Sequence, residues 1–263
     1  MANADPAPRP LRQDELTGLA KTDRKFEAMA FTSAVALDEL DLSDCLFVGC
    51  TFDLPAVRGA DFSGAQFKDC RFSPGRFASC KFPGARFQGT SFFDADQKKG
   101  CTFAFCDLRD VDAEECNFAV GSFERCDMHD FRARECSFRG VRFHASTFTK
   151  AISKRVIVTR ARFEACNFTF TDFSGVSLES CEFLTCKFLD TALFDVNLTD
   201  AVLRDCSLDK AEWERANLTR ADFRGSTISG LNLAVLSGYA GLMISESQQT
   251  ELLERLGVSV NLD

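Results

Sequence analysis

Phenylalanine recurs at every fifth residue over a long stretch of this chain, and that spacing constrains the fold more than any other feature. Between Ala60 and Phe92 the rings stand at Phe62, Phe67, Phe72, Phe77, Phe82, Phe87 and Phe92, and a small residue precedes each ring by two positions. A period of five matches neither the 3.6-residue repeat of a helix nor the two-residue alternation of a strand. The spacing therefore predicts a chain that turns a corner every five residues and points the central residue of each five inward.

The period continues from Leu42 to Leu233, with one change of phase between Phe92 and Phe103. Of the 28 phenylalanines, 21 stand at the inward position, named i here, and all 13 cysteines stand at i−2. Because one phase holds every cysteine, the i−2 position requires a small, buried and mildly apolar side chain, which a free thiol provides. An internal repeat of this kind predicts a solenoid whose coils contact mainly their neighbours.

The repeat resembles the pattern A/C-D/N-L/F-x-x of the pentapeptide repeat family, roughly from Leu40 to Leu233. The resemblance implies an all-β fold, a right-handed quadrilateral β-helix in which four pentapeptides form one coil. Residues twenty apart are then expected to stack, with Phe62 under Phe82 and Cys116 under Cys136. At about 4.8 Å between stacked strands, nine or so coils make a rod on the order of 45 Å long.

The pattern predicts three parts of the chain. Residues 1–36 are expected to form an N-terminal extension, disordered at its start and carrying a short capping helix within 11–30, and residues 37–235 the β-helix. Residues 236–263 are expected to form a C-terminal helix and tail. The helix is predicted over Glu246–Leu256, because Ser245 and Gln248 have the spacing of a capping box.

Two breaks in the repeat are expected to leave the coil as loops, at 93–100 and 149–161. The first lacks an inward apolar residue. The second keeps the count of five but places Ser153 at i, and its Thr149–Ala161 stretch carries a net charge of +4. Surface loops on a rigid scaffold often carry function. A tolerated insertion is the alternative for each.

Both breaks and the tail resemble one branch of the family, the Qnr quinolone-resistance proteins. The resemblance rests on Phe92-Phe93-Asp94 and Lys99-Gly100-Cys101-x-Phe103, on Ile152 to Arg155, on Trp213-x-x-Ala216-Asn217-Leu218-Thr219, and on Leu252 to Val258. The first stretch before the repeat is longer here than in that branch, and Ser153 and Lys154 alter the second loop.

The resemblance implies a protein that binds DNA gyrase and topoisomerase IV and protects them from quinolones or other poisons, without catalysis. A homodimer resembling duplex DNA in size and negative charge is implied, with the loops contacting the enzyme and no direct binding of nucleic acid. The partner-binding residues are then Asp94, Asp96, Gln97, Lys98, Lys99 and Gly100 in the first loop and Ile152, Ser153, Lys154 and Arg155 in the second. The dimer contact is expected at Leu252, Leu253 and Leu256.

The charge is distributed unevenly along the chain. Residues 66–162 have twelve acidic and eighteen basic side chains, a net +6, whereas residues 163–224 have twelve and six, a net −6. An acidic final third repels nucleic acid and suits a partner with a basic groove. A solvated surface that keeps the rod soluble is the alternative interpretation.

The remaining composition argues against an enzyme. His129 and His144 follow i positions and are expected to be exposed, and no nucleophile–base pair or phosphate-binding loop is recognisable. The cysteines are predicted to be free thiols rather than metal ligands, although stacked pairs such as Cys186 and Cys206 have a spacing near that of a disulfide. No cofactor is expected. The start of the chain has no signal-peptide core and no long apolar run follows, so a cytoplasmic protein without a membrane span is predicted.

Two other functions remain open from the sequence. One is a generic scaffold for protein–protein interaction, which would have no need of the two loops at these positions. The other is self-immunity in a strain that produces its own topoisomerase poison.

Overall fold

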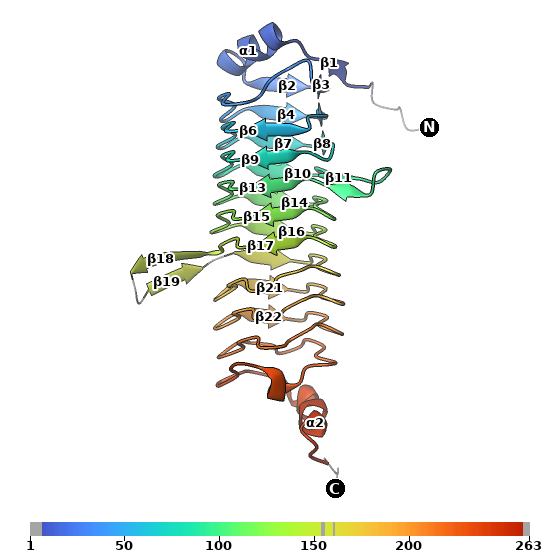
Figure 1. The fold of residues 1–263 in the computed structure, drawn as a ribbon, viewed down its shortest axis with the longest axis vertical. Coiled ribbons are helices and arrows are strands. Elements are labelled where there is room, and N and C mark those ends of the chain that lie inside the picture. The colour runs from blue at the N-terminus through green and yellow to red at the C-terminus, as the bar shows by residue number, and fades with distance from the viewer. Residues whose placement is uncertain (1–6, 154–155, 160, 260–263) are drawn as a thin grey trace.

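The chain winds into a quadrilateral β-helix of about nine turns that stands as a rod, with a helix at each end (Figure 1). The computed structural model describes residues 7–153, 156–159 and 161–259. Most strands have two or three residues, and parallel pairing connects each coil to the next. The predicted fold class is confirmed.

The longest sheet runs along one face of the rod and has nine parallel strands. In spatial order they are β2 (Lys25–Glu27), β4 (Leu46–Val48), β7 (Gln66–Lys68), β10 (Arg86–Gln88), β14 (Asp112–Glu114), β16 (Arg132–Arg134), β20 (Arg162–Glu164), β21 (Glu182–Leu184) and β22 (Val202–Arg204). The middle residue of each strand is buried and its two neighbours face outward, so three residues suffice to form one side of a coil.

Two shorter parallel sheets form other sides of the rod. One contains β1 (Arg9–Pro10), β3 (Met29–Phe31), β5 (Thr51–Phe52) and β8 (Arg71–Phe72) in that order. The other contains β17 (Arg142–His144), β15 (Ser122–Glu124), β13 (Thr102–Ala104), β9 (Arg76–Ala78) and β6 (Ala56–Arg58). Isolated parallel bridges continue the stacking elsewhere, for example between Asp107 and Asp127.

Stacked aromatic rings fill the core, as the twenty-residue repeat predicts. Phe62 stacks on Phe82 with ring centroids 5.0 Å apart. Phe72 stacks between Phe52 and Phe92 at 4.3 Å and 4.6 Å. Because nearly parallel rings on successive coils replace water with neighbouring ring faces, the column buries a large apolar area in a narrow rod.

At two successive coils a small residue occupies the inward position i and a larger one occupies i−2. Ala113 and Ala133 are directly paired in β14 and β16, and both are buried at i. Their i−2 neighbours, Val111 and Phe131, are 1% exposed, so the larger side chains fill the core from the adjacent corner.

The cysteines are all free and buried, and most of them stand in one column of i−2 residues. This thiol column consists of Cys50, Cys70, Thr90, Cys116, Cys136, Cys166, Cys186, Cys206 and Ser226. The backbone N–H of Cys116 donates to the Sγ of Cys136 at 3.3 Å, and the N–H of Cys186 donates to the Sγ of Cys206 at 3.4 Å.

At corners that follow a β-strand, the backbone N–H of the i−2 residue thus donates to the Sγ or Oγ of the i−2 residue on the next coil, as at Cys116 and Cys186. A polar side chain is therefore useful at i−2 in this column. At β-turn corners the i−2 N–H bonds instead to a carbonyl of its own coil, as from Ala65 to Phe62 O at 3.0 Å and from Ala85 to Phe82 O at 2.9 Å. Alanine suffices at such positions. The column thus reflects hydrogen bonding as well as the small size inferred from the sequence.

The coil stack begins earlier and ends later than predicted. Phe26 stacks on Phe47 at 4.9 Å, so the first coil lies within residues 1–36. The spacing from Phe26 to Phe47 is one residue longer than the repeat, which hides the first coil in the sequence. At the other end, the N–H of Phe223 donates to the carbonyl of Met243 at 2.8 Å, beyond the predicted end at 235.

Helix α1 (Gln13–Lys21) covers the first coil and buries Leu16 and Ala20, one turn apart. Part of the predicted disorder, over residues 1–6, lies outside the described residues, whereas Arg9–Pro10 pairs with β3. The short helix η1 (Leu233–Val235) precedes the last stretch of the stack.

Helix α2 (Glu246–Arg255) follows the capping box predicted at Ser245 and Gln248. The Gln248 side chain accepts from the N–H of Ser245 and donates to the carbonyl of Phe223 at 2.8 Å, which ties the helix to the last coil. None of the helices in the described part of the chain has the length and apolar character needed to cross a bilayer.

Candidate functional site: two hairpins and a carboxylate coil

The first predicted loop is a hairpin that leaves the rod between β10 and β13. Strands β11 (Phe93–Asp94) and β12 (Lys99–Gly100) pair antiparallel, with Phe93 opposite Gly100 and Asp94 opposite Lys99. The side chains of Asp96, Gln97, Lys98 and Lys99 are exposed at its tip. The loop residues predicted as a binding site are thus brought together on one projecting element.

Asp94 organises the turn of this hairpin. Its Oδ1 accepts the N–H groups of Asp96 and Gln97, both at 2.9 Å, and its Oδ2 accepts from the Gln97 side chain at 3.2 Å. The Gln97 N–H is the main cause that holds the pKa of the Asp94 carboxyl below its ordinary value. Asp94 therefore shapes the loop from its base, and the exposed residues beyond it are the ones available to a partner.

Gly100 seats the hairpin against the next coil. A Cβ at this residue would lie 2.4 Å from the carbonyl oxygen of Ala119 and 2.6 Å from the nitrogen of Gly121. Both obstacles are backbone atoms that cannot move aside, so a larger residue would push the hairpin off the rod. Gly100 therefore positions the loop against the rod.

The second predicted loop is also a hairpin. Strands β18 (Thr149–Ser153) and β19 (Val156–Thr159) pair antiparallel, with Thr149 opposite Thr159. Ser153 ends β18 outside the coil, so its assignment to an inward position was wrong. The reason is that the chain leaves the stack after Phe148, and Ala133 pairs with Phe163, thirty residues on. Lys154 and Arg155 lie outside the described residues, and Ile152 is placed in β18.

The structure does not combine the two hairpins into one site. In Figure 1 the β11–β12 hairpin and the β18–β19 hairpin project from opposite sides of the rod. A partner that contacts both must therefore wrap around the rod or present two separate surfaces.

His129 is buried, contrary to the expectation that both histidines are exposed. Its exposed fraction is 7%, and its Nε2 lies 3.0 Å from a carboxylate oxygen of Asp130. Thr147, on the next coil toward the C-terminus, forms a parallel bridge with Asp127. The start of β18 therefore lies next to His129 in the stack and covers it. His144 is exposed as predicted.

One coil of the acidic third carries an aspartate at every corner. The four residues are Asp190, Asp195, Asp200 and Asp205, and their φ values are 51°, 53°, 56° and 54°. Aspartate tolerates this left-handed backbone better than most residues, so the corner position favours it. We name residues 190–205 the carboxylate coil. The sequence signal, an aspartate at every fifth residue, was present but was not singled out.

Arginines on the next coil pair with two of these aspartates. Arg215 bonds to Asp195 and Arg220 bonds to Asp200, with N–O distances of 2.5 Å and 2.6 Å. The arginine hydrogen bonds are the main cause that lowers the pKa of both carboxyls. Asp195 and Asp200 therefore stay ionised at neutral pH, each paired with an arginine on the side nearer the C-terminus.

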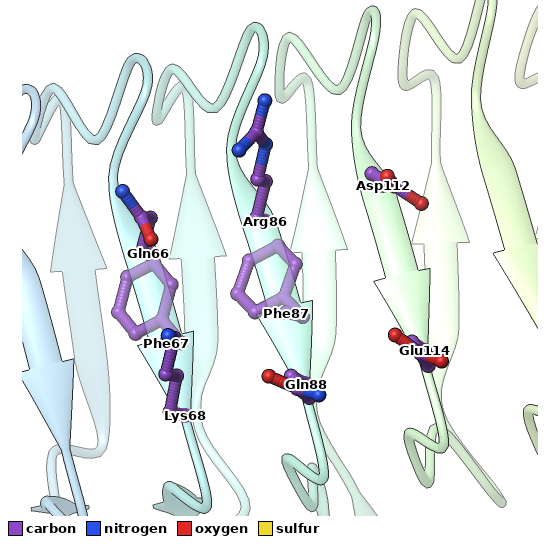
Figure 2. A pocket seen from close by; sticks show the side chains of 8 residues that line it. All are labelled: Gln66, Phe67, Lys68, Arg86, Phe87, Gln88, Asp112 and Glu114. Atoms are coloured by element: carbon purple, nitrogen blue, oxygen red, sulfur yellow. The ribbon is translucent and has the colours of Figure 1, made fainter.

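A shallow depression of about 190 Å³ lies on the outer face of the nine-stranded sheet. Figure 2 shows outward polar side chains of β7, β10 and β14 around it, including Lys68, Arg86 and Glu114. Basic and acidic groups alternate there without a nucleophile beside a base. Within the described residues, no cluster of His, Cys, Asp or Glu has the arrangement of a metal site.

The predicted dimer residues differ in their surroundings. Leu252 is 5% exposed and belongs to the core of its own chain, whereas Leu253 is partly buried and Leu256 is 47% exposed. Tyr239, Met243 and Val258 are also exposed at this end of the rod, at 49%, 41% and 48%. Leu252 thus fastens α2 to the rod, whereas the exposed apolar side chains remain accessible at this end.

Comparison with known proteins agrees with this geometry. Residues 156–233 match the family model described as a pentapeptide repeat region. The chain is 26% identical over 91 residues to the pentapeptide repeat protein QnrB4 of Escherichia coli, covering 35% of this chain and 42% of that protein. It is 24% identical over 164 residues to the quinolone resistance pentapeptide repeat protein QnrB96 of Scandinavium goeteborgense, covering 62% of each. The matched parts thus span less than two thirds of either relative.

Solved structures share the fold. A trypsin-treated form of QnrB1, a plasmid-mediated fluoroquinolone resistance protein, superposes with a TM-score of 0.67 at 22% identity, covering 81% of this chain and 99% of that one. HetL, a pentapeptide repeat protein involved in heterocyst differentiation in Nostoc, gives 0.59 at 12% identity, covering 89% and 94%. The same rod therefore serves proteins with different roles.

Proposed function

The chain is a Qnr-like pentapeptide repeat protein, and on that premise we propose that it binds a bacterial type II topoisomerase, DNA gyrase or topoisomerase IV, and protects it from quinolones. The protein acts by occupying a surface of the enzyme that otherwise holds a DNA segment. The relative QnrB96, named for quinolone resistance, and the structural neighbour QnrB1, named for fluoroquinolone resistance, support the choice of this class.

The carboxylate coil is the observation that carries the proposal. Its four aspartates project from the four corners of a rigid rod, so a carboxylate stands at each corner at one level, and arginines of the next coil pair with two of the four, Asp195 and Asp200. A groove that binds duplex DNA is lined with basic side chains and accepts charge presented around a cylinder. Since burial in the core fixes each corner, the charges are held in place before binding, which lowers the cost of ordering them.

A protection assay tests this function directly. Supercoiling by purified gyrase is measured at rising ciprofloxacin concentration with and without the protein, and the protein is expected to raise the inhibitory drug concentration. The same result with topoisomerase IV would extend the partner to both enzymes. A protein that leaves the drug response of both enzymes unchanged contradicts the proposal and favours a generic scaffold.

The contribution of the carboxylate coil is tested by Asp190→Asn with Asp205→Asn. Asparagine also tolerates the left-handed backbone, so the change removes charge with little effect on the corner. Weaker protection with an unchanged melting temperature is the expected result. Ser180→Asn serves as the matched control, because it alters another left-handed corner, φ 59°, without changing charge.

The contribution of the first hairpin is tested by deleting residues 94–99. Phe93 and Gly100 are already paired across the hairpin, about 5 Å apart by the spacing of antiparallel partners, so the shortened chain closes with little rearrangement. We expect the variant to fold like the parent and to protect the enzyme less well. Full protection by this variant would remove the first hairpin from the binding surface.

We further propose that two copies associate through their C-terminal ends. Leu256, Met243 and Tyr239 are exposed there, and each apolar side chain that becomes fully buried contributes roughly 1.5–3 kcal/mol at most. Repulsion between the two acidic thirds opposes association and is screened by salt. The product is a rod of about twice the length with the carboxylate coils near its centre.

Light scattering at micromolar concentration tests the assembly. The unaltered protein is expected at twice the chain mass of 29.1 kDa, and Leu256→Asp is expected to shift it to the monomer. Leu252 is unsuitable for this test, because its loss would damage the core of the protomer. A monomeric unaltered protein would contradict the dimer but leave the proposed partner standing.

A further inference from the structure

Two phenylalanines stand in positions that the stability of the rod does not explain. Phe105 and Phe170 are 54% and 51% exposed, whereas the stacked rings of the core are buried. Both have left-handed backbone, with φ of 56° and 61°. A bulky residue is rare and strained there, and an exposed ring contributes little to folding. Strain of this kind marks candidate functional positions.

The two rings flank one face of the rod. Phe105 directly follows β13, and Phe170 lies two residues before Asp172, which bridges to Arg142 at the start of β17. Strands β13, β15 and β17 are adjacent in the five-stranded sheet. The rings therefore stand at opposite edges of this face, three coils or about 14 Å apart along the rod.

Arginines accompany both rings. The guanidinium carbon of Arg125 lies 5.7 Å from the centroid of the Phe105 ring, and that of Arg139 lies 5.1 Å from the centroid of the Phe170 ring. Arg142, also exposed, begins β17 between them. We name Phe105, Arg125, Arg139, Arg142 and Phe170 the aromatic–arginine face. Cation–π contact holds each arginine beside its ring, so both groups are pre-arranged.

The composition of this face is that of a protein interface. Aromatic residues and arginine are enriched at the centres of interfaces and carry much of the binding energy there. Val120, 45% exposed, stands at the same corner of the rod as Phe170 and adds apolar surface. The first hairpin seats on this corner as well, since Gly100 packs against Ala119 and Gly121. The face is therefore continuous with a surface already proposed to bind the partner.

We propose that the aromatic–arginine face docks on an acidic, partly apolar protein surface of the topoisomerase, separate from the basic groove that receives the carboxylate coil. This inference rests on the proposed function for the identity of the partner. Opposite charges at two levels of one rod favour a single orientation, because the basic face is repelled by the groove and the carboxylate coil by the acidic surface.

A nucleic acid strand is the rival occupant, since exposed rings and arginines also stack on bases. Most of the face lies within residues 66–162, which are net +6, but the chain as a whole has a net charge of −8. Residues 163–224, from the level of Phe170 onward, carry a net −6 that repels phosphate along the rest of the rod, so a protein surface is favoured over a long strand.

The decisive variant is Phe105→Asn with Phe170→Asn. Asparagine fits left-handed backbone better than phenylalanine, so the double variant is expected to be at least as stable as the parent. Thr185→Asn is the matched control. Thr185 is an exposed corner residue with φ 55° that follows β21 on another side of the rod.

Binding to immobilised gyrase subunits and topoisomerase IV subunits is measured by surface plasmon resonance. The double asparagine variant is expected to bind at least tenfold more weakly and Thr185→Asn within twofold of the parent. Arg125→Glu with Arg139→Glu is expected to weaken binding at least tenfold as well, with the larger loss at low salt. A 20-nucleotide single strand is injected in parallel, and no binding is expected.

Each other outcome overturns a specific claim. If the double asparagine variant binds and protects as well as the parent, the aromatic–arginine face is refuted while the proposed function stands. If the parent binds the single strand and the variant does not, the protein partner for this face is refuted. If the parent binds no topoisomerase subunit, the proposed function and this inference both fail.

Discussion

Removing the ring of Phe72 is expected to lower the free energy of unfolding by about 3–5 kcal/mol, the usual cost of a large-to-small change in a core. The structure supports this magnitude. Phe72 is 2% exposed and stacks between Phe52 and Phe92, with interplanar angles of 3° and 22°. Lost burial contributes roughly 1.5–3 kcal/mol, and each stacked pair adds about 0.5–1.5 kcal/mol, so the total is consistent with the expected range.

Urea unfolding followed by circular dichroism measures the effect of Phe72→Ala. A lower midpoint with an unchanged slope indicates that the whole rod still unfolds together, whereas a lower slope indicates that coils on the two sides of the cavity separate. Phe105→Ala is the matched control, because the same atoms are removed from a ring that is 54% exposed. Its effect is expected to stay within about 0.5 kcal/mol or to stabilise.

Two results would refute this reasoning. A loss below about 1 kcal/mol for Phe72→Ala would mean that the ring is not held in a packed column. An equal loss for Phe105→Ala would mean that burial does not set the cost of removing a ring from this rod.

Three further predictions concern buried groups. Thiol titration of unfolded, unreduced protein is expected to find all 13 cysteines reactive, and a count of only a few would indicate disulfides. The folded protein is expected to react slowly because all 13 thiols are buried away from the reagent, and at Cys101 burial also raises the thiol pKa to about 12. Cys206→Ala is expected to cost about 1–3 kcal/mol in urea unfolding, because it leaves the N–H of Cys186 without its Sγ partner, and Cys206→Ser is expected to cost less; equal costs would contradict the role of the thiol column. Asp222 is 3% exposed and bonded by Arg204 and Arg224, whose hydrogen bonds hold its pKa far below the ordinary value. Its stabilisation is therefore complete above the unfolded carboxyl pKa of about 3.9 and is lost as pH falls toward the folded value, so the stability difference from Asp222→Asn should shrink below about pH 4; a difference that does not change with pH would refute the pairing.

The five-residue period by itself predicted a solenoid that turns a corner every five residues and points the central residue of each five inward. The square coil of four pentapeptides, and with it the stacking of residues twenty apart, came from the resemblance to the pentapeptide repeat family, and the structure confirms both. The same five-residue period located both hairpins, because residues 93–100 and 149–161 interrupt it. The capping box placed α2, since its signal is local to Ser245 and Gln248.

Features that depend on the neighbouring coil were decided only by the tertiary structure. His129 is buried because the chain enters β18 on the coil above it, and Leu252 is buried because α2 folds back onto the last coil. The first coil, at Phe26, was not recognised in the sequence because a single added residue separates it from the period that follows. The period also does not distinguish corners that follow a strand from β-turn corners. That difference explains why the thiol column carries side chains that accept a backbone N–H, whereas alanine suffices at β-turn corners.

The places that the charged residues and the exposed rings take on the rod were likewise decided only by the tertiary structure. The sequence contains Phe105 and Phe170 outside the inward phase and an aspartate at every fifth residue from Asp190. It does not state which corners of the rod these residues share. That placement depends on how four pentapeptides close into one coil and on the two insertions that shift the register, and it decides which surfaces a partner meets.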